Sequence, residues 1–232
     1  MNLPFAYSVV RSARRKSACI QIKNAQVTLR APVNYPTADL LAFAASKSSW
    51  ILAKLDEQQT RLAVAPVAPI WDTDSLLPFM GEKLRLVVQE GSFNAVARMG
   101  DTLMMVINKR GKAARAEKIH AQLVHWYSDE ALRILSIKTH SLAANIGRRV
   151  TQVTIKATKT KWGHCTRGGA IQYNWQILLA PEPVVDYLVA HEVSHLIHHD
   201  HSPAFWAQVA QLCPDFLALR RWLKQQGTQL VL

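Results

Sequence analysis

The sequence of 232 residues predicts an α+β fold. Three observations lead to this class. The first thirty residues alternate apolar and polar side chains in short runs, which is typical of strands. Apolar residues recur at helical spacing from Ala114 to Ile146, which predicts a long helix. A strongly apolar segment around residue 190 carries two histidines four residues apart, which predicts a helix with a chemical role.

The N-terminal region is predicted to begin with three strands, at residues 7–10, 19–23 and 27–30. The basic stretch 11–16 separates the first two strands. Asn24-Ala25 links the last two, because two residues of this kind between alternating runs are typical of a hairpin.

A helical stretch begins at Thr37, with apolar residues at helical spacing as far as Leu55. A proline-bearing loop over residues 65–78 separates this helix from two further strands, at 84–88 and 103–107.

The sequence therefore divides into a strand-rich region with one helix, residues 1–112, and a second region, residues 113–232. The second region opens with the long helix, for which Gly147 is a natural stop. Two strands are expected after it, at 150–158 and 170–179.

Prolines and capping residues mark the last three helices. Pro181 and Pro183 bracket the start of the helix that carries the paired histidines. Ser202-Pro203 opens the next helix as N-cap and first helical residue, and Pro214 ends it. A final helix is expected from Asp215 to Gly227.

The composition excludes several classes of protein. Hydrophobic residues make up 49% of the chain, which rules out wholesale disorder. No window approaches about 18 uninterrupted apolar residues, so no membrane partner is expected. The first residues lack the basic and apolar regions of a secretory signal. Three scattered cysteines, Cys19, Cys165 and Cys213, favour a reducing, cytoplasmic location over a disulfide scaffold.

The formal net charge is +12 and is unevenly placed. Residues 1–62 carry nine Lys or Arg against three Asp or Glu, and residues 151–170 carry four basic and no acidic residues. Residues 171–232 are net acidic. A basic surface attracts anionic partners, so a nucleotide or nucleic acid is one expected partner. The alternative is a basic protein with no such partner.

The segment His191-Glu192-Val193-Ser194-His195 contains the pattern H-E-x-x-H. Four residues turn a helix by about 400°, so His191 and His195 lie on one face, one turn apart. Both imidazoles can then reach one Zn²⁺ ion. Glu192 lies about 100° around the helix from His191, beside the ion, where it can exchange protons with water.

The third ligand follows by elimination. No Glu occurs after Glu192, and His198 would lie about 10.5 Å along the helix axis from His191. The helix must therefore end and the chain must turn back. His201 lies ten residues beyond His191, at the third-histidine spacing of the longer pattern H-E-x-x-H-x-x-G-x-x-H.

Two departures from that longer pattern stand out. His198 replaces its glycine, and no Met follows Met105, so a Met-turn enzyme is excluded. Either residues 198–200 turn by another route, or the third ligand is a different residue. The sequence leaves the roles of His164, His198 and His199 open.

A wider set of residues surrounds this pattern: Lys161-Trp162-Gly163-His164-Cys165, Gly169, Ile171, Asn174-Trp175, Asp186-Tyr187, His201-Ser202 and Phe205-Trp206. With these residues the chain resembles the YgjP-like metallopeptidases, a family similar to the SprT and WLM zincins. The resemblance is strong over residues 148–206 and looser in the N-terminal part. His164 departs from the family, which usually has Ser there.

This resemblance implies that residues 113–232 form one compact zincin-like domain. Its parts would be a long backing helix, a small sheet and the active-site helix. His191, His195 and His201 would hold the metal and Glu192 would act as the base. The resemblance does not imply a substrate.

Four further residues are candidates for binding substrate: Lys161, Arg167, Asn174 and Tyr187. The strand 171–179 is expected at the edge of the cleft, where it can pair with an extended peptide. Trp162, Trp175 and Trp206 are expected in the core and Cys165 as an inert thiol.

Peptide hydrolysis by a zinc-dependent enzyme is therefore the leading hypothesis, with a peptide or protein as the substrate. A second hypothesis is hydrolysis of a nucleoside triphosphate. The phosphates would then be bound by Arg14, Arg15, Lys159, Lys161 and Arg167. A third is a DNA-associated SprT-like protease or binding protein.

Overall fold

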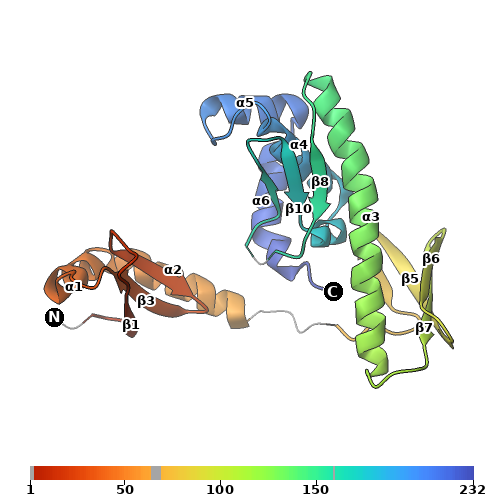
Figure 1. The fold of residues 1–232 in the computed structure, drawn as a ribbon, viewed down its shortest axis with the longest axis horizontal. Coiled ribbons are helices and arrows are strands. Elements are labelled where there is room, and N and C mark those ends of the chain that lie inside the picture. The colour runs from red at the N-terminus through yellow and green to blue at the C-terminus, as the bar shows by residue number, and fades with distance from the viewer. Residues whose placement is uncertain (1–2, 64–68, 159) are drawn as a thin grey trace. The chain divides into compact units, whose positions relative to one another are not determined.

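The computed structural model describes residues 3–63, 69–158 and 160–232, and its class is α+β, as predicted. It divides into two compact units, residues 1–65 and 66–232 (Figure 1). This division differs from the predicted one after residue 112. The strands of residues 76–108 share one apolar core with the long helix α3 (Arg115–Asn145), which a reading of local sequence patterns does not reveal.

The first unit contains a three-stranded sheet followed by two helices. Its strands are β1 (Tyr7–Arg11), β2 (Cys19–Lys23) and β3 (Gln26–Ala31), in the order β1-β3-β2. Strand β3 runs parallel to β1 and antiparallel to β2. Asn24 and Ala25 make the predicted hairpin turn, with φ angles of 51° and 55°.

The predicted single helix of this unit is two helices, α1 (Thr37–Ser46) and α2 (Ser48–Ala63). The hydroxyls of Ser46 and Ser48 donate to the carbonyl oxygens of Phe43 and Ala45, at 2.8 Å each. Such bonds compete with the helical ladder and favour a break at this point. Val27, Leu29 and Ala31 pack against apolar residues of both helices, so one face of the sheet is covered.

The second unit begins with a four-stranded sheet in the order β4-β5-β7-β6. Its strands are β4 (Leu76–Phe79), β5 (Glu82–Gly91), β6 (Ala95–Met99) and β7 (Thr102–Asn108). Alternate residues of β5 and β7 are buried against α3. The Tyr127 hydroxyl of α3 also donates to the carbonyl oxygen of Pro78 at 2.6 Å, which fixes the helix on the sheet.

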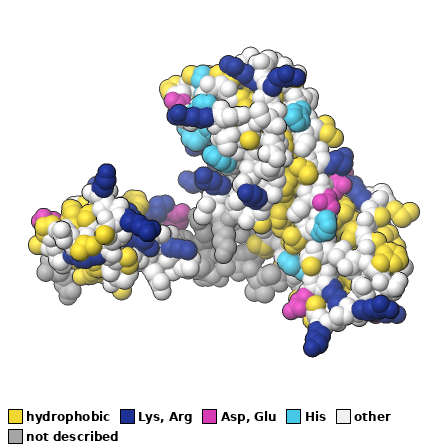
Figure 2. All heavy atoms as spheres, viewed as in Figure 1, with side chains coloured by type: hydrophobic (Ala, Val, Ile, Leu, Met, Phe, Trp, Pro, Cys, Tyr) yellow, Lys and Arg dark blue, Asp and Glu magenta, His cyan; other side chains and the backbone are white. Residues whose placement is uncertain are grey.

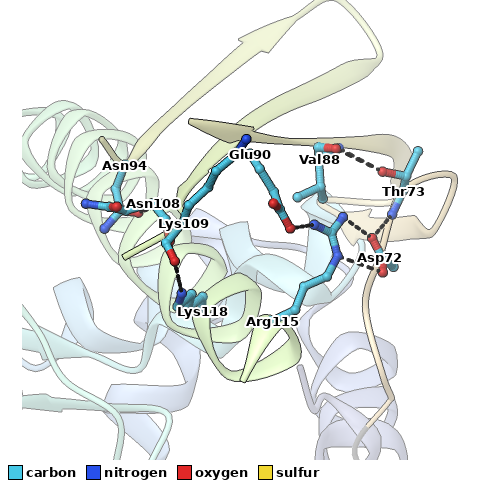
Figure 3. A network of polar contacts seen from close by, with 9 residues as sticks. All are labelled: Asp72, Thr73, Val88, Glu90, Asn94, Asn108, Lys109, Arg115 and Lys118. Carbon is cyan, nitrogen blue, oxygen red and sulfur yellow. Dashed lines mark hydrogen bonds and ion pairs between the residues drawn. The ribbon is translucent and has the colours of Figure 1, made fainter. Parts of the chain in front are cut away.

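Polar contacts join the start of α3 to strands β5 and β7 and to the segment before β4 (Figure 3). Arg115 donates to Asp72 at 2.8 Å and to Glu90 at 3.0 Å. Lys118 donates to the carbonyl oxygen of Asn108 at 3.0 Å. At the other end, α3 stops before Gly147, whose φ is 64°, as predicted.

A second, three-stranded sheet follows α3, with the order β8-β10-β9. Its strands are β8 (Gln152–Ile155), β9 (Gly163–Cys165) and β10 (Ala170–Tyr173). The prediction of one cleft-edge strand over residues 171–179 is wrong. β10 lies in the centre of the sheet, and residues 175–179 form a 3₁₀ helix, η1, because Asn174 caps it by accepting the N–H of Gln176. The edge strands are β8 and β9.

The last three helices are α4 (Glu182–Ser194), α5 (Pro203–Leu212) and α6 (Phe216–Gln226), followed by the short 3₁₀ helix η2 (Gly227–Gln229). Helix α4 contacts α3, α5 and α6, so it is enclosed on several sides (Figure 1). In the part of the chain that is described, no helix is long and apolar enough to cross a membrane.

Candidate metal centre

Three histidines lie close together around the end of α4 and the loop that leads to α5. His191 lies in the last turn of α4, His195 directly follows it, and His201 lies in the loop before α5. One ring nitrogen from each lies within 4.8 Å of the other two. The Nε2 atoms of His191 and His201 are 3.3 Å apart. The structure thus brings the three predicted ligands together.

The chain turns back as the third-ligand hypothesis requires. Helix α4 ends at Ser194, whose hydroxyl donates to the carbonyl oxygen of Ala190 at 2.7 Å. His198 has no positive φ, so the turn is made without the glycine conformation of the longer pattern. Ser202 then accepts the N–H of Phe205 at 3.4 Å and opens α5, as predicted.

Hydrogen bonding selects the nitrogen that His195 presents. Its Nδ1 bonds the carbonyl oxygen of His198 at 2.8 Å, which leaves Nε2 free to face the other two rings. His198 therefore contributes through its backbone, whereas His199 is exposed.

Aromatic side chains hold the three imidazoles. Phe205 is fully buried; its ring stacks on His195 at 4.4 Å between centroids and meets His191 and His201 edge-on at 5.0 and 4.9 Å. Trp206 stacks on His201 at 5.6 Å. These contacts fix the ring positions before any ligand binds.

Burial favours the neutral form of His191 and His195. Burial, and then the neighbouring His195, His201 and Arg220, lower the pKa of His191 to about 3. Burial also lowers the pKa of His195. Neutral imidazoles are the form that binds metals.

The donor set fits one tetrahedral ion. Nitrogens that lie about 2.0–2.1 Å from Zn²⁺ at tetrahedral angles are about 3.3–3.4 Å apart. The 3.3 Å between His191 and His201 has this value. Such a site needs only three protein ligands, with water as the fourth.

Glu192 lies beside the three histidines and is almost completely buried, with 4% of its surface exposed. Burial raises its pKa to about 8, and the charge of Lys161 opposes that rise. Its Oε2 atom has no hydrogen-bond partner among the described residues. A buried carboxylate oxygen without a partner is costly and suggests a role with a bound group.

A cavity of about 450 Å³ opens beside these residues. Lys161 and Tyr187 line it together with His191 and Glu192, so two of the four predicted substrate-binding residues reach the candidate site. Burial raises the pKa of Tyr187 to about 12.

The family model for the YgjP-like metallopeptidase domain matches residues 16–226. The chain belongs to this family. A search of curated proteins finds no match, and a search of solved structures finds none either.

Asn174 and Arg167 lie elsewhere in the YgjP-like domain. The Asn174 side chain donates to the carbonyl oxygen of Thr158 at 3.0 Å and accepts the N–H of Gln176 at 3.1 Å. It is therefore engaged within the fold. Arg167 lines a second cavity.

The five basic residues that the nucleotide hypothesis assigned to phosphate binding do not form one site among the described residues. Arg14 and Arg15 belong to the first unit, Lys161 and Arg167 line different cavities of the second, and Lys159 lies outside the described residues.

The edge strand β9 runs along the cavity of this YgjP-like domain. The N–H of Asn174 donates to the carbonyl oxygen of Trp162 at 2.7 Å, and the N–H of Thr166 to that of Ala170 at 2.9 Å. Bonded pairs alternate along an antiparallel ladder, so the backbone groups of Gly163 and Cys165 point to the free edge. Both residues line the cavity.

Sequence reasoning missed two features of the site. A Cβ atom on Gly163 would lie 2.3 Å from Oε1 of Glu192, so any other residue there would displace the Glu192 side chain. Gly163 stood inside the quoted motif, but nothing in the sequence linked it to Glu192. Arg220 lies over the Trp206 ring at 4.3 Å, and no sequence signal indicated it.

Two other expectations concern side chains around the cavity. Trp175 is buried and packs on Tyr127, and Trp162 and Trp206 are half-buried. Burial, and then the charge of Glu192, raise the pKa of the Cys165 thiol to about 11. Such a thiol is a weak nucleophile at neutral pH, in line with the prediction.

Proposed function

We propose that this YgjP-like protein is a zinc-dependent metallopeptidase with a zincin-like domain. The observation that carries the proposal is the convergence of His191, His195 and His201 within 4.8 Å, with the buried Glu192 beside them. An all-imidazole donor set suits Zn²⁺. When bound, the ion supplies Lewis acidity toward water and toward the scissile carbonyl.

Glu192 acts as the general base and then the general acid. It takes a proton from the attacking water, whose oxygen forms a bond to the carbonyl carbon. It then gives that proton to the leaving nitrogen as the C–N bond breaks. The buried position of Glu192 keeps bulk water from competing for this proton.

The remaining cavity residues orient the substrate. The outward backbone groups of Gly163 and Cys165 can pair with an extended peptide, which adds a strand to the sheet. Lys161 and Tyr187 line the same cavity, and we assign them the role of donating to the carbonyl oxygen as negative charge develops there. These features favour a peptide or protein as the substrate.

The test is peptide-library hydrolysis by the purified chain, with zinc, with a chelator, and after zinc is restored. We expect cleavage that chelation abolishes and zinc restores. Glu192→Gln should lower kcat/KM by about 100- to 10,000-fold while zinc content is unchanged. A Glu192→Gln protein with full activity would contradict the mechanism. A nucleotide panel run in parallel tests phosphate release, the competing hypothesis.

A second proposal concerns the partner of the first unit. Residues 1–38, which contain the three strands of this unit, include six Lys or Arg and no Asp or Glu. A basic surface suits nucleic acid. A salt-dependent shift of DNA in gels would support this, and no shift at low salt would remove it.

We also propose that the protein is located in the cytoplasm. All three cysteines are free thiols in the structure, which fits a protein that works in the cytoplasm.

A further inference from the structure

A second cavity, of about 290 Å³, lies beside the candidate metal centre. Three segments enclose it: the residues that follow α3, the turn between β9 and β10, and the residues that follow α4. The side of the second unit that carries α5 displays histidines with Lys and Arg side chains next to them (Figure 2).

The lining of this cavity is strongly basic. It includes Arg148, Arg149, Arg167 and His199, and among the described residues no Asp or Glu lines it. We call these three arginines the arginine pocket. Within the described ranges, none of the three side chains forms an ion pair or a hydrogen bond.

Several other arginines of the same unit are paired. Arg85 pairs with Asp74, Arg98 with Glu82 and Arg133 with Glu130. The three guanidinium groups are exposed around one cavity, so their positive charges add there and attract an anion. The arginine pocket is therefore suited to an anionic ligand.

The backbone holds the arginine pocket in place. The N–H of Gly169 donates to the carbonyl oxygen of Thr166 at 3.0 Å and closes a turn with Arg167 at its tip. Gly169 has a φ of 78°, and a Cβ there would lie 3.5 Å from the carbonyl oxygen of Arg149. The turn and the segment after α3 thus pack directly on each other.

The arginine pocket adjoins the metal centre. His199 lines both cavities. Gly163, which faces Glu192, and Arg167 are four residues apart, so at most about 14 Å of extended chain separates them. A substrate laid along β9 would reach the pocket within about four residues of its scissile bond.

We propose that the arginine pocket binds a carboxylate of the peptide substrate, either an acidic side chain or the C-terminus, within about four residues of the cleaved bond. Guanidinium groups match carboxylates in shape and bind them through two parallel hydrogen bonds. This inference rests on the proposed peptidase function and adds a substrate preference to it.

The experiment measures binding rather than turnover. Fluorescein-labelled peptide pools are titrated against the full-length, zinc-loaded Glu192→Gln protein, which binds without cleaving. Each pool fixes Glu at one position, and a matched pool fixes Gln; further pools carry a free or an amidated C-terminus. Because a peptide can pair with β9 in either direction, Glu is scanned through every position.

We expect one Glu position, or the free C-terminus, to bind at least about 10-fold tighter than its neutral match. Arg148→Gln and Arg167→Gln should each remove most of that preference. Arg110→Gln is the matched control, because Arg110 precedes α3 and lies roughly 46 Å along that helix from the pocket. Thermal unfolding of each variant checks that it is folded.

Equal binding of acidic and neutral pools would overturn the inference, as would a preference that both arginine variants retain. Competition by a nucleoside triphosphate, with no acidic-peptide preference, would also overturn it and identify phosphate as the ligand. Failure of the peptidase function alone looks different. The wild-type protein would then cleave no peptide, while the Glu192→Gln protein would still prefer the acidic pool.

Discussion

Two groups of polar side chains in the second unit differ in whether their polar atoms have partners. At the start of α3, Arg115 is bound by both Asp72 and Glu90, all three are well exposed, and every charge has a partner (Figure 3). At the end of α4, Glu192 is buried, and neither its Oε2 nor Nδ1 of His191 has a hydrogen-bond partner in the part of the chain that the structure describes.

This difference distinguishes polar groups that stabilise the fold from polar groups that are available to bind a ligand. An ion pair exposed to water contributes little to the free energy of unfolding. Buried groups without partners are costly, and they persist where the surrounding structure fixes them for a ligand. Here Phe205 and Trp206 pack against the His191 ring, and Gly163 lies next to the Glu192 carboxyl group. Variants at the two places should therefore differ in what they change: metal and activity at α4, a little stability at α3.

His201→Ala should produce the largest effect at the α4 end. It removes one of three nitrogen donors, and even the loss of an outer hydrogen-bond partner costs about 10- to 100-fold in metal affinity. We expect zinc affinity to fall by more than about 100-fold, and activity at limiting zinc to fall with it. Zinc competition against a chromophoric chelator measures this.

His164→Ala is the control for that measurement, because His164 is exposed and lines the cavity without belonging to the three-histidine group. If the His201→Ala protein holds zinc as tightly as wild type, the third ligand is a different residue.

Gly163→Ala should act on Glu192 alone. The added Cβ would lie 2.3 Å from Oε1, so the carboxylate must move. A displacement of about 1 Å at a catalytic group can cost about 100-fold in rate, so we expect kcat/KM to fall by about 10- to 100-fold with zinc content unchanged. Steady-state kinetics and metal analysis measure the two quantities.

A second glycine separates this effect from general strain. Gly100 has a φ of 62°, and no atom of the described residues would lie within 4 Å of a Cβ added to it. Gly100→Ala should cost about 1 kcal/mol of stability and leave kcat/KM unchanged. Equal losses of activity in both variants would show that Gly163 matters only for folding.

Sequence periodicity and caps predicted the long elements well. Residues 114–146 were expected as a helix and α3 spans Arg115–Asn145; the hairpin at Asn24-Ala25 and the Ser202 cap were also confirmed. These features depend on local interactions, which one sequence reveals. The meeting of His201 with His191 was predictable too, because ligand chemistry restricts the possible donors.

Tertiary context decided the rest. Strand β9 has only three residues, too few for an alternating pattern to stand out. The apolar run 175–179 fits a strand but is a 3₁₀ helix, because Asn174 caps it. The close approach of Gly163 to Glu192 joins elements far apart in the chain, and no local pattern predicts it.

Asn174→Ala tests whether Asn174, a predicted substrate-binding residue, acts in stability or in binding. Asn174 is buried, and its side chain bonds Thr158 and Gln176. Loss of a cap of this kind costs about 0.5–2 kcal/mol. We expect that loss of stability in denaturant unfolding, with kcat/KM of the folded protein within about threefold of wild type. A large kinetic loss without destabilisation would instead support a direct role in binding.

Arg115→Gln should have the smallest effect. Its two ion pairs are exposed, and each such pair contributes about 0–1 kcal/mol. Hydrogen bonding from Arg115 lowers the pKa of Asp72, so the stability that the pair contributes is present at neutral pH. It is lost as the pH falls through the lowered pKa of that carboxyl, below the usual value of about 3.9.

Denaturant unfolding of wild type and Arg115→Gln at pH 7 and in acid therefore tests the α3 end. The difference between the two proteins should be small at pH 7, shrink in acid, and leave zinc binding and kcat/KM unchanged. Gln retains much of the length of Arg, so packing along the side-chain stem changes little and the charge is the main loss. A loss of zinc affinity in this variant would mean that the two ends of the unit are coupled, and that the paired charges of α3 help to shape the metal centre.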